Sequence, residues 1–313
     1  MFGRALIVKI ATMRPIRAFV SSSRLVRPLV GRFIAGEDLS GALDASRKLL
    51  DKSLLVSLDY LGENTRSKSE ASQAVCTYIE MLDRIGSMPE TAARPGQREP
   101  LNISIKLTQC GLDQEEAFAE ENLRRVLQKA QSHENFVRVD MEGSDYTERT
   151  LQMVERVFAD LPNTGTVLQS YLYRTDEDVE RMIGAGIRIR LVKGAYLEPA
   201  SVAYPEKAKV DEAYVRQAKR LLEFGNYPAI ATQDDQIIRE VVDFSKAKAI
   251  DAGRFEFQML YGIRRDLQES LVRDGFNVRI YVPFGDAWYP YFTRRLAERP
   301  ANALFIFRAL LKG

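Results

Sequence analysis

Short runs of β-branched and other apolar residues recur along the chain, and each is followed by a stretch with the period of an amphipathic helix. The apolar runs cover residues 54–60, 102–107, 136–141, 165–171, 187–193, 228–233, 254–260 and 278–284. The helical stretches cover residues 69–86, 115–131, 147–160, 176–186, 211–225, 235–247 and 264–275. Eight strands in strict alternation with helices predict an α/β fold of the (β/α)8 barrel type. An open doubly wound sheet seldom needs eight such units.

Several predicted strands carry polar side chains where a barrel core usually holds Val, Ile and Leu. One group comes early in the strands, and we expect it to form an internal layer of ion pairs: Arg138, Arg188, Glu256 and Arg279. A second group falls near the C-terminal strand ends, the barrel face where catalytic groups lie in this fold. Its members are Lys106, Asp140, Gln169, Arg190, Gln258 and Tyr281.

A final helix is predicted after the eighth strand, within residues 286–300. Tyr291, Arg294, Arg295 and Glu298 stand at positions i, i+3, i+4 and i+7, so they form one stripe on its surface. Such a stripe can be a solvated face. The adjacent arginines can equally clamp one carboxylate through bidentate hydrogen bonds. Spacing alone favours neither interpretation.

Composition restricts the chemistry. The 313 residues include one histidine, His133, and two cysteines, Cys76 and Cys110. A disulfide scaffold and metal sites needing several His or Cys ligands are therefore excluded. The sequence also lacks a GxGxxG or P-loop motif, which disfavours a Rossmann-type dehydrogenase. An enzyme built from this chain would use carboxylates, Arg, Lys, Tyr or an organic cofactor.

The net charge of +2 conceals an asymmetry. Residues 1–36 hold seven basic residues and no acidic one, so residues 37–313 carry −5. We interpret residues 1–50 as a basic N-terminal helical arm and residues 51–313 as the catalytic barrel. The arm either packs on its own domain or contacts a membrane or another acidic partner. The acidic remainder argues against nucleic-acid binding.

Seven motifs, in order, resemble those of the proline dehydrogenase family over about residues 50–310. They are NISIKLT at 102–108, VRVDME at 137–142, RLVKGAY at 190–196, ATQD at 231–234, FEFQMLYG at 255–262, VRIYVPFG at 278–285 and YFTRRLAE at 291–298. The length is similar to that of the monofunctional bacterial members. The resemblance implies a distorted (β/α)8 barrel whose final helix lies over the barrel mouth and which binds FAD at the C-terminal strand ends. It also implies oxidation of L-proline to Δ1-pyrroline-5-carboxylate, with electrons passed to a membrane quinone.

The resemblance assigns a role to each matching residue of the proline site. Arg294 and Arg295 would hold the proline carboxylate with help from Lys106. Tyr281, Tyr291 and Leu191 would surround the ring, and Asp140 and Glu298 would balance and orient the cationic cluster. Proline would give a hydride from C5 to flavin N5, with Asp140 and Arg190 as the catalytic pair. The acceptor of the amine proton stays open among Lys106, Asp140 and water.

The same resemblance predicts the residues that contact FAD. Arg190 would donate toward flavin N5, while Lys193, Gly194 and Ala195 would approach the phosphates and ribityl chain. The remaining FAD contacts would come from Met141, Gln169, Val192, Tyr196, Thr232, Gln233 and Gln258.

One position departs from the family pattern. Gln233 stands where the motif usually has histidine, so the group can donate and accept hydrogen bonds but carries no charge. We expect FAD to bind with changed affinity or redox poise. Two alternatives stay open: a catalytically weakened relative, and an oxidase of another cyclic secondary amine such as hydroxyproline. The expected location is the cytoplasm, with peripheral contact at the inner membrane through the arm.

Overall fold

A computed structural model of the chain describes residues 27–91 and 98–298. Its eight strands form a closed barrel, in which every neighbouring pair, including β1 with β8, is parallel. The strands are β1 (Leu55–Tyr60), β2 (Leu101–Ile105), β3 (Val137–Val139), β4 (Thr164–Gln169), β5 (Arg188–Val192), β6 (Ala229–Ala231), β7 (Glu256–Leu260) and β8 (Asn277–Phe284). The (β/α)8 barrel predicted from the sequence is confirmed. The predicted strands extend a few residues beyond the observed ones, mostly at their C-terminal ends.

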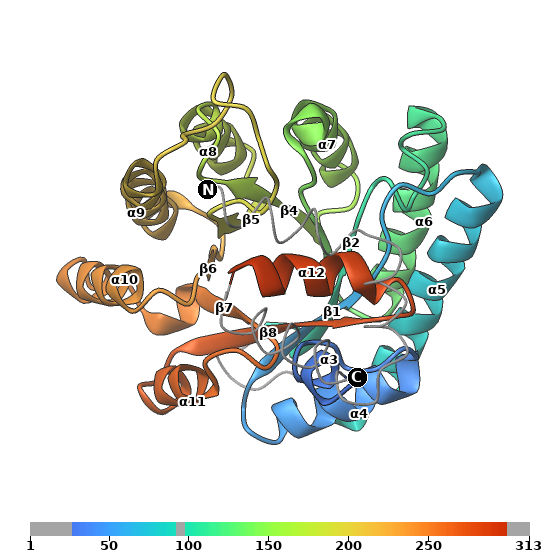
Figure 1. Ribbon diagram of the computed structural model, residues 1–313, viewed down its shortest axis with the longest axis horizontal. Helices are drawn as coiled ribbons and strands as arrows, with labels where there is room; N and C mark the ends of the chain where they lie inside the picture. Colours follow the sequence, from blue (N-terminus) through green and yellow to red (C-terminus); the bar gives the residue numbers. More distant parts are fainter. Residues whose placement is uncertain (1–26, 92–97, 299–313) are drawn as a thin grey trace, which may run out of the picture.

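Helices surround the barrel as Figure 1 shows, and their apolar faces pack on the strands. Those described are α3 (Arg27–Phe33), α4 (Leu39–Leu50), α5 (Lys68–Gly86), α6 (Glu116–Ser132), α7 (Ser144–Phe158), α8 (Thr175–Gly184), α9 (Lys207–Phe224), α10 (Asp235–Ala247), α11 (Arg265–Arg273) and α12 (Trp288–Glu298). Two short 3₁₀ turns, η1 (Pro89–Thr91) and η2 (Ala252–Arg254), complete the described elements.

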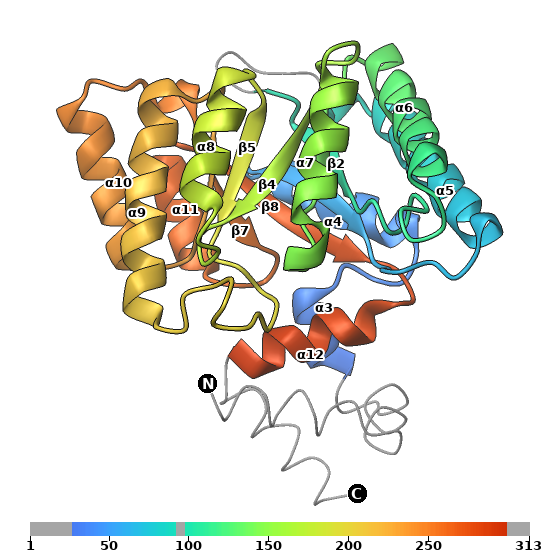
Figure 2. The same ribbon diagram turned by 90° about the horizontal axis from the view of Figure 1, so that it is seen from above.

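The arrangement departs from a regular barrel at one place. Helix α4 packs on β1 and β8, the position that the helix after the eighth strand would normally fill. The last helix, α12, instead crosses the barrel mouth and lies beside α3 (Figures 1 and 2). Trp288 and Phe292 of α12 pack with Phe33 and Ile34 in a small apolar cluster outside the main core. Helix α12 thereby places Tyr291, Arg294 and Arg295 above the strand ends.

Residues 27–50 belong structurally to the barrel, although the sequence interpretation assigns them to a separate arm. Phe33 and Ile34 are buried, and the backbone N–H of Ala35 donates to the carbonyl oxygen of Pro283 at 2.9 Å. Gly262, with φ of +73°, lies so close to α3 that a Cβ there would fall 1.7 Å from the Arg32 carbonyl oxygen. A side chain at position 262 would therefore push α3 away. Residues 1–26 of the predicted arm lie outside the described residues.

Charged and polar side chains fill much of the barrel interior, where Val, Ile and Leu are usual, and apolar strand residues face the surrounding helices. On β5, for example, Arg188 and Arg190 point inward, while Ile189 and Leu191 are buried in the core beneath the helices. The period of two that puts alternate strand residues on opposite faces fixes this division.

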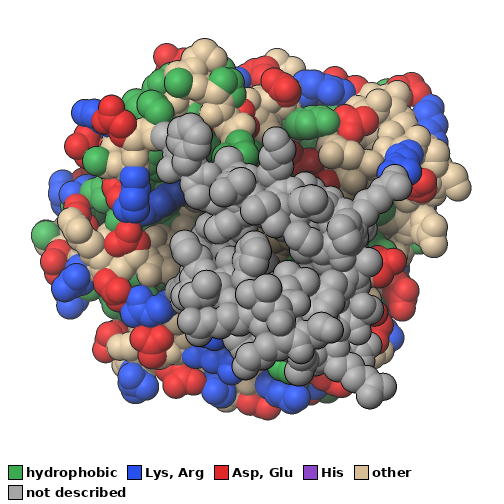
Figure 3. Space-filling view, in the orientation of Figure 1, with side chains coloured by type: hydrophobic (Ala, Val, Ile, Leu, Met, Phe, Trp, Pro, Cys, Tyr) green, Lys and Arg blue, Asp and Glu red, His purple; other side chains and the backbone are tan. Residues whose placement is uncertain are grey.

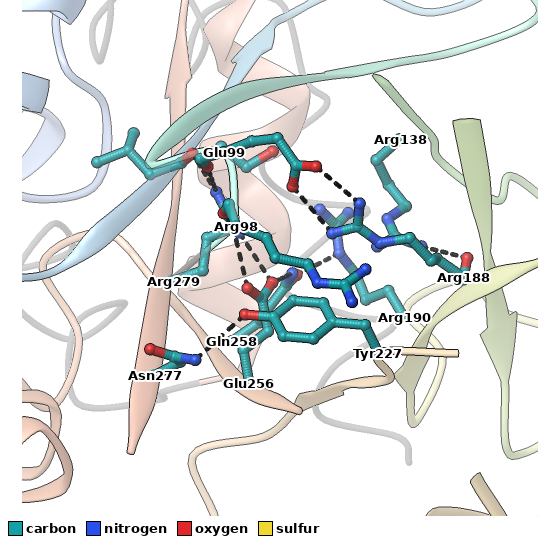
Figure 4. A network of polar contacts seen from close by, with 12 residues as sticks. Arg98, Glu99, Arg138, Arg188, Arg190, Tyr227, Glu256, Gln258, Asn277 and Arg279 are labelled. Carbon is teal, nitrogen blue, oxygen red and sulfur yellow. Dashed lines mark hydrogen bonds and ion pairs between the residues drawn. The ribbon is translucent and has the colours of Figure 1, made fainter. Parts of the chain in front are cut away.

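Three of the four residues predicted for the internal ion-pair layer, Arg188, Glu256 and Arg279, form ion pairs at the N-terminal end of the barrel (Figure 4). The expectation is not met for Arg138, which pairs with no carboxylate among the described residues. Arg279 is 1% exposed and forms two hydrogen bonds with the Glu256 carboxylate, at 2.8 and 3.0 Å. Its other N–H groups donate to the carbonyl oxygens of Val56, Glu99 and Arg98, so all five donors are used. Arg188 makes a bidentate pair with Glu99 at 2.9 and 3.0 Å. Arg138 donates to the carbonyl oxygens of Thr166 and Arg188.

Charged side chains on the outer surface, unlike those of the buried layer, are exposed to solvent. Around the rim in Figure 3, acidic and basic side chains are interspersed. Many form ion pairs between neighbouring helices, such as Arg181 of α8 with Glu148 of α7 at 3.1 Å and Arg220 of α9 with Glu180 of α8 at 2.6 Å. Exposed pairs of this kind contribute little individually.

The buried layer predicts a clear contrast in stability. Glu256→Gln leaves the Arg279 charge buried without its anion, which should lower the free energy of unfolding by about 3–5 kcal/mol. The matched control is Glu269→Gln, because Glu269 pairs with Lys52 at the surface. That variant should leave the free energy of unfolding almost unchanged. Chemical denaturation followed by circular dichroism measures both. Equal, small losses would show that the Arg279–Glu256 pair does not stabilise the barrel.

Candidate active site

A cavity of about 500 Å³ opens at the C-terminal ends of the strands, beneath α12. Its lining comes from all eight strands or the loops that follow them, and from α12. Seventeen of the residues predicted from the sequence line it: Lys106, Asp140, Met141, Gln169, Arg190, Val192, Lys193, Gly194, Ala195, Tyr196, Thr232, Gln233, Gln258, Tyr281, Tyr291, Arg294 and Arg295. The structure thus brings together groups that are up to about 190 residues apart in the chain.

Two residues predicted for the site are not among those that line the cavity. Leu191 lies elsewhere, and the side chain of Glu298 lies outside the described residues. Leu191 is fully buried on the outer face of β5, packed in the core and away from the cavity. The expectation that it closes the apolar side of the proline site is therefore not met, because residues 190 and 192 occupy the inward positions of this strand. Glu298 ends α12, and its side chain lies outside the described residues.

Arg190 occupies the centre of the polar interior. It donates to the Asp140 carboxylate and, at 3.0 Å, to Ser104 Oγ, and its Nε donates to Gln258 Oε1. Gln258 Nε2 donates in turn to Glu256, which links Arg190 to the ion-pair layer below it (Figure 4). This chain of contacts fixes which end of the Gln258 amide faces Arg190. The guanidinium group is therefore held rigidly within the barrel.

Asp140 accepts hydrogen bonds from two elements besides its own strand end. Tyr281 Oη donates to Asp140 Oδ2 at 2.7 Å, while Arg190 donates to Oδ1. Burial and the Asp140 charge raise the pKa of Tyr281 well above its usual value, so its hydroxyl stays protonated and remains a donor. The Arg190 guanidinium also lies 5.2 Å from the centre of the Tyr281 ring.

A second buried ion pair joins β1 to the end of β2. Lys106 Nζ donates to Asp59 Oδ1 at 2.8 Å, and both side chains are almost fully buried. Burial opposes the charged form of Lys106, but Asp59, Asp140 and Glu63 together raise its pKa above the usual value. Lys106 is therefore an ammonium group at neutral pH.

Three acidic residues of the lining have no role in the sequence predictions: Asp59, Glu63 and Asp234. Asp59 shares the inward side of β1 with Ser57, so strand period could have identified it. Glu63 pairs with Arg294 at 2.9 Å, and Asp234 pairs with Lys193 at 3.1 Å. Nothing in the sequence links these loop carboxylates to their partners, since each pair joins distant segments.

A buried glutamate supports the loop that carries Glu63. Glu142 accepts from Thr108 Oγ1 at 2.7 Å, and Thr108 Oγ1 accepts from the Asn64 backbone N–H at 3.0 Å. Burial raises the pKa of Glu142 to about 7, and hydrogen bonds from Thr108 oppose that rise only in part. The β1–α5 loop is thereby tied to the strand ends.

The donor set of the cavity suits a large ligand rich in acceptor atoms. Arg190 and the amides of Gln169, Gln233 and Gln258 present polar groups suited to a heterocycle with carbonyl groups. Lys193 precedes Gly194, which has φ of +117° and where a Cβ would lie 2.5 Å from the Tyr171 ring. The backbone there can approach a ligand closely. These residues fit a flavin nucleotide.

The end of the cavity under α12 suits a small anionic ligand. Arg294 and Arg295 both line it, and their guanidinium groups lie 5.9 Å from the Tyr196 ring centre and 5.3 Å from the Tyr291 ring centre. Burial opposes the charge of Arg294, but Glu63 raises its pKa above the usual value. Arginines beside aromatic rings can bind one carboxylate and one short apolar body.

The closed barrel, with polar side chains around a cavity at its C-terminal strand ends, has the architecture of a barrel enzyme. Comparison with known proteins identifies its class as an oxidoreductase. The family model described as proline dehydrogenase matches residues 42–308. The chain is 40% identical over 290 residues to the proline dehydrogenase of Deinococcus radiodurans, covering 91% of each chain. It is 38% identical over 286 residues to proline dehydrogenase 2 of Bacillus subtilis, again covering 91% of each. The chain belongs to the proline dehydrogenase family.

Solved structures support the fold. The proline utilization A protein of Bdellovibrio bacteriovorus superposes with a TM-score of 0.81, covering 95% of this chain and 36% of that longer one. Sequence identity in this comparison is 24%, so the likeness concerns the barrel alone.

Proposed function

We propose that this enzyme oxidises L-proline to Δ1-pyrroline-5-carboxylate with FAD as its electron acceptor. The observation that supports this most directly is that Arg294 and Arg295 of α12 line the same cavity as Arg190 of β5. The proposed carboxylate site and the proposed flavin site would thus be neighbours. Family membership supplies the reaction.

The cavity residues divide into two groups in this proposal. Arg190, Gln258, the segment 192–196, Thr232, Gln233, Met141 and Gln169 would hold FAD. When bound, FAD supplies the acceptor for the electron pair of the proline C5–H bond. Arg190 would lie against the electron-rich part of the reduced ring system, where a fixed cation stabilises added negative charge. Its contacts to Asp140, Ser104 and Gln258 keep it in place for that role.

Proline would bind under α12 through both of its ends. Its carboxylate would contact Arg294, Arg295 and Lys106, and its ring would pack against Tyr281 and Tyr291. Arg294 is paired with Glu63 at 2.9 Å, so the incoming carboxylate must share or replace that partner. α12 and the rings would exclude water from the C5–H bond during transfer.

The cofactor proposal has a direct test. Purified protein should be yellow, and the molecule released by heat should elute with FAD in chromatography. Because Gln233 can still donate and accept hydrogen bonds, added FAD should restore colour to protein from which it has been removed. Released FMN, or a colourless protein that rejects added FAD, would contradict the proposal.

Replacing Arg295 separates substrate binding from cofactor binding. A charged hydrogen bond contributes about 1.5–3 kcal/mol, so Arg295→Ala should weaken proline binding by about 10- to 100-fold. Flavin content should not change. The control is Arg239→Ala, because Arg239 is exposed on α10 and, among the described residues, donates only to the Asp235 carbonyl oxygen of its own helix. The proline concentration that gives half of the maximal rate of anaerobic flavin reduction measures the affinity, and equal loss of FAD and proline binding would exclude the carboxylate role.

We also propose that a membrane quinone takes the electrons and that residues 1–26 contact the cytoplasmic face of the membrane. These residues contain five basic side chains and no acidic ones, which suits anionic lipids. Within the described residues, no helix has the length and hydropathy needed to cross a bilayer.

Removing residues 1–26 tests this contact. Truncation should stop before α3, because Phe33 and Ile34 are buried against α12. Turnover with a water-soluble dye should be unchanged, while sedimentation with anionic vesicles should fall strongly and lose its salt dependence. Undiminished vesicle binding by the truncated protein would contradict the role of this segment.

A further inference from the structure

The buried carboxylate of Asp59 lines the cavity, but it has no role in the proposed flavin and carboxylate sites. Asp59 is 1% exposed and belongs to the lining of the cavity. Its Oδ1 accepts from Lys106 Nζ at 2.8 Å, whereas its buried Oδ2 has no hydrogen-bond partner among the described residues. A buried carboxylate oxygen without a donor is costly to keep charged. Asp59 is therefore well suited to take up a proton.

The neighbouring carboxylate, that of Asp140, differs from Asp59 in its hydrogen bonds. Both oxygens of Asp140 already accept hydrogen bonds, Oδ1 from Arg190 and Oδ2 from Tyr281. Protonating Asp140 would break the contacts that hold these two groups. Asp59 can bind a proton without losing any such contact except the one to Lys106, which exchanges the proton with it.

The groups facing Asp59 come from four elements: Lys106 at the end of β2, Asp140 after β3, Tyr281 on β8 and Tyr78 on α5. Burial raises the pKa of Asp59, and Asp140 raises it further, while Lys106 and Tyr281 offset only part of the rise. The same environment holds Lys106 in its protonated form. Lys106 alone therefore cannot be the final acceptor of a proton.

Oxidation at C5 requires the nitrogen lone pair of proline to be free, because that pair forms the C=N bond as the C5–H electron pair leaves. Free proline carries its amine as an ammonium group. A group within the cavity must receive its proton.

We infer that Asp59 is the terminal acceptor of the proton that the proline amine loses before C5 is oxidised, with Lys106 as the conduit. This inference rests on the proposed proline oxidation. The amine passes its proton to Lys106 Nζ as Lys106 passes one of its own to Asp59 Oδ1. Lys106 is unchanged, Asp59 becomes neutral, and the amine gains its lone pair. Asp59 returns the proton to solvent after the product leaves.

The test compares two substrates that differ in the basicity of the amine. Fluorine at C4 withdraws electrons, so the amine of 4,4-difluoroproline is largely uncharged at about pH 8, where the amine of proline is still an ammonium group. Asp59→Asn is nearly isosteric and removes the basic oxygen together with the negative charge that pairs with Lys106. Flavin reduction by saturating substrate is followed anaerobically by stopped-flow absorbance for both proteins.

A lost general base lowers rates by about 10²- to 10⁴-fold. Asp59→Asn should therefore slow reduction by proline at least about 100-fold at about pH 8. Reduction by difluoroproline should fall less than about threefold. With proline, the rate of the variant should rise about tenfold per pH unit toward high pH as free amine accumulates. Similar losses for both substrates at every pH would overturn the inference.

Controls separate this role from a structural one. Asp140→Asn should slow both substrates alike, because Asp140 holds Arg190 and Tyr281. FAD content of Asp59→Asn, and its affinity for the ring-oxygen analogue tetrahydro-2-furoic acid, should match those of the parent, since that ligand has no amine proton. If Asp59→Asn does not retain FAD, Asp59→Glu and Asp59→Gln replace it, with the loss for proline expected only in Asp59→Gln.

Failure of the underlying function gives a different result. If the parent protein binds FAD but is reduced by neither substrate, proline oxidation itself is refuted and the role of Asp59 with it. If the parent is reduced and the variants show no selectivity for proline, only the role of Asp59 is refuted.

Discussion

The neutralisation of buried arginines by buried carboxylates is the interaction on which this barrel depends. Arg279 with Glu256 fills its base, and Arg190 with Asp140 fills its middle. An unpaired guanidinium in this interior would be costly, so each layer requires its partner. The layers also connect, because Glu256 accepts from Gln258 and Gln258 accepts from Arg190. The packing that closes the barrel therefore also orients the group that would face the flavin.

The route of the chain explains how the other half of the site forms. Because α4 packs over β1 and β8, where the helix after the eighth strand would normally lie, α12 is free to lie across the mouth. Its arginines come from a helix, whereas Arg190 and Lys106 come from strand ends. The apolar cluster with α3 holds α12 in place. Substrate and cofactor would thus be bound by residues from elements that come together only in the folded protein.

Much of this could be predicted from the sequence. The eight strands follow from the period of their apolar residues, and the buried ion-pair layer follows from arginine and glutamate early in four of them. Strand period would also have excluded Leu191, since 188, 190 and 192 face inward, and it would have identified Asp59 beside Ser57. The partners could not be predicted. Glu99 reaches Arg188 and Glu63 reaches Arg294 from loops whose paths depend on the whole fold.

In the proposed function, one cavity holds FAD and proline close enough for direct reduction. The decisive measurement is anaerobic titration of the purified flavoprotein with L-proline. The oxidised flavin band near 450 nm should be bleached, with one proline consumed per flavin and one Δ1-pyrroline-5-carboxylate formed. Protein that carries FAD but keeps its full absorbance with saturating proline would refute proline oxidation in this cavity.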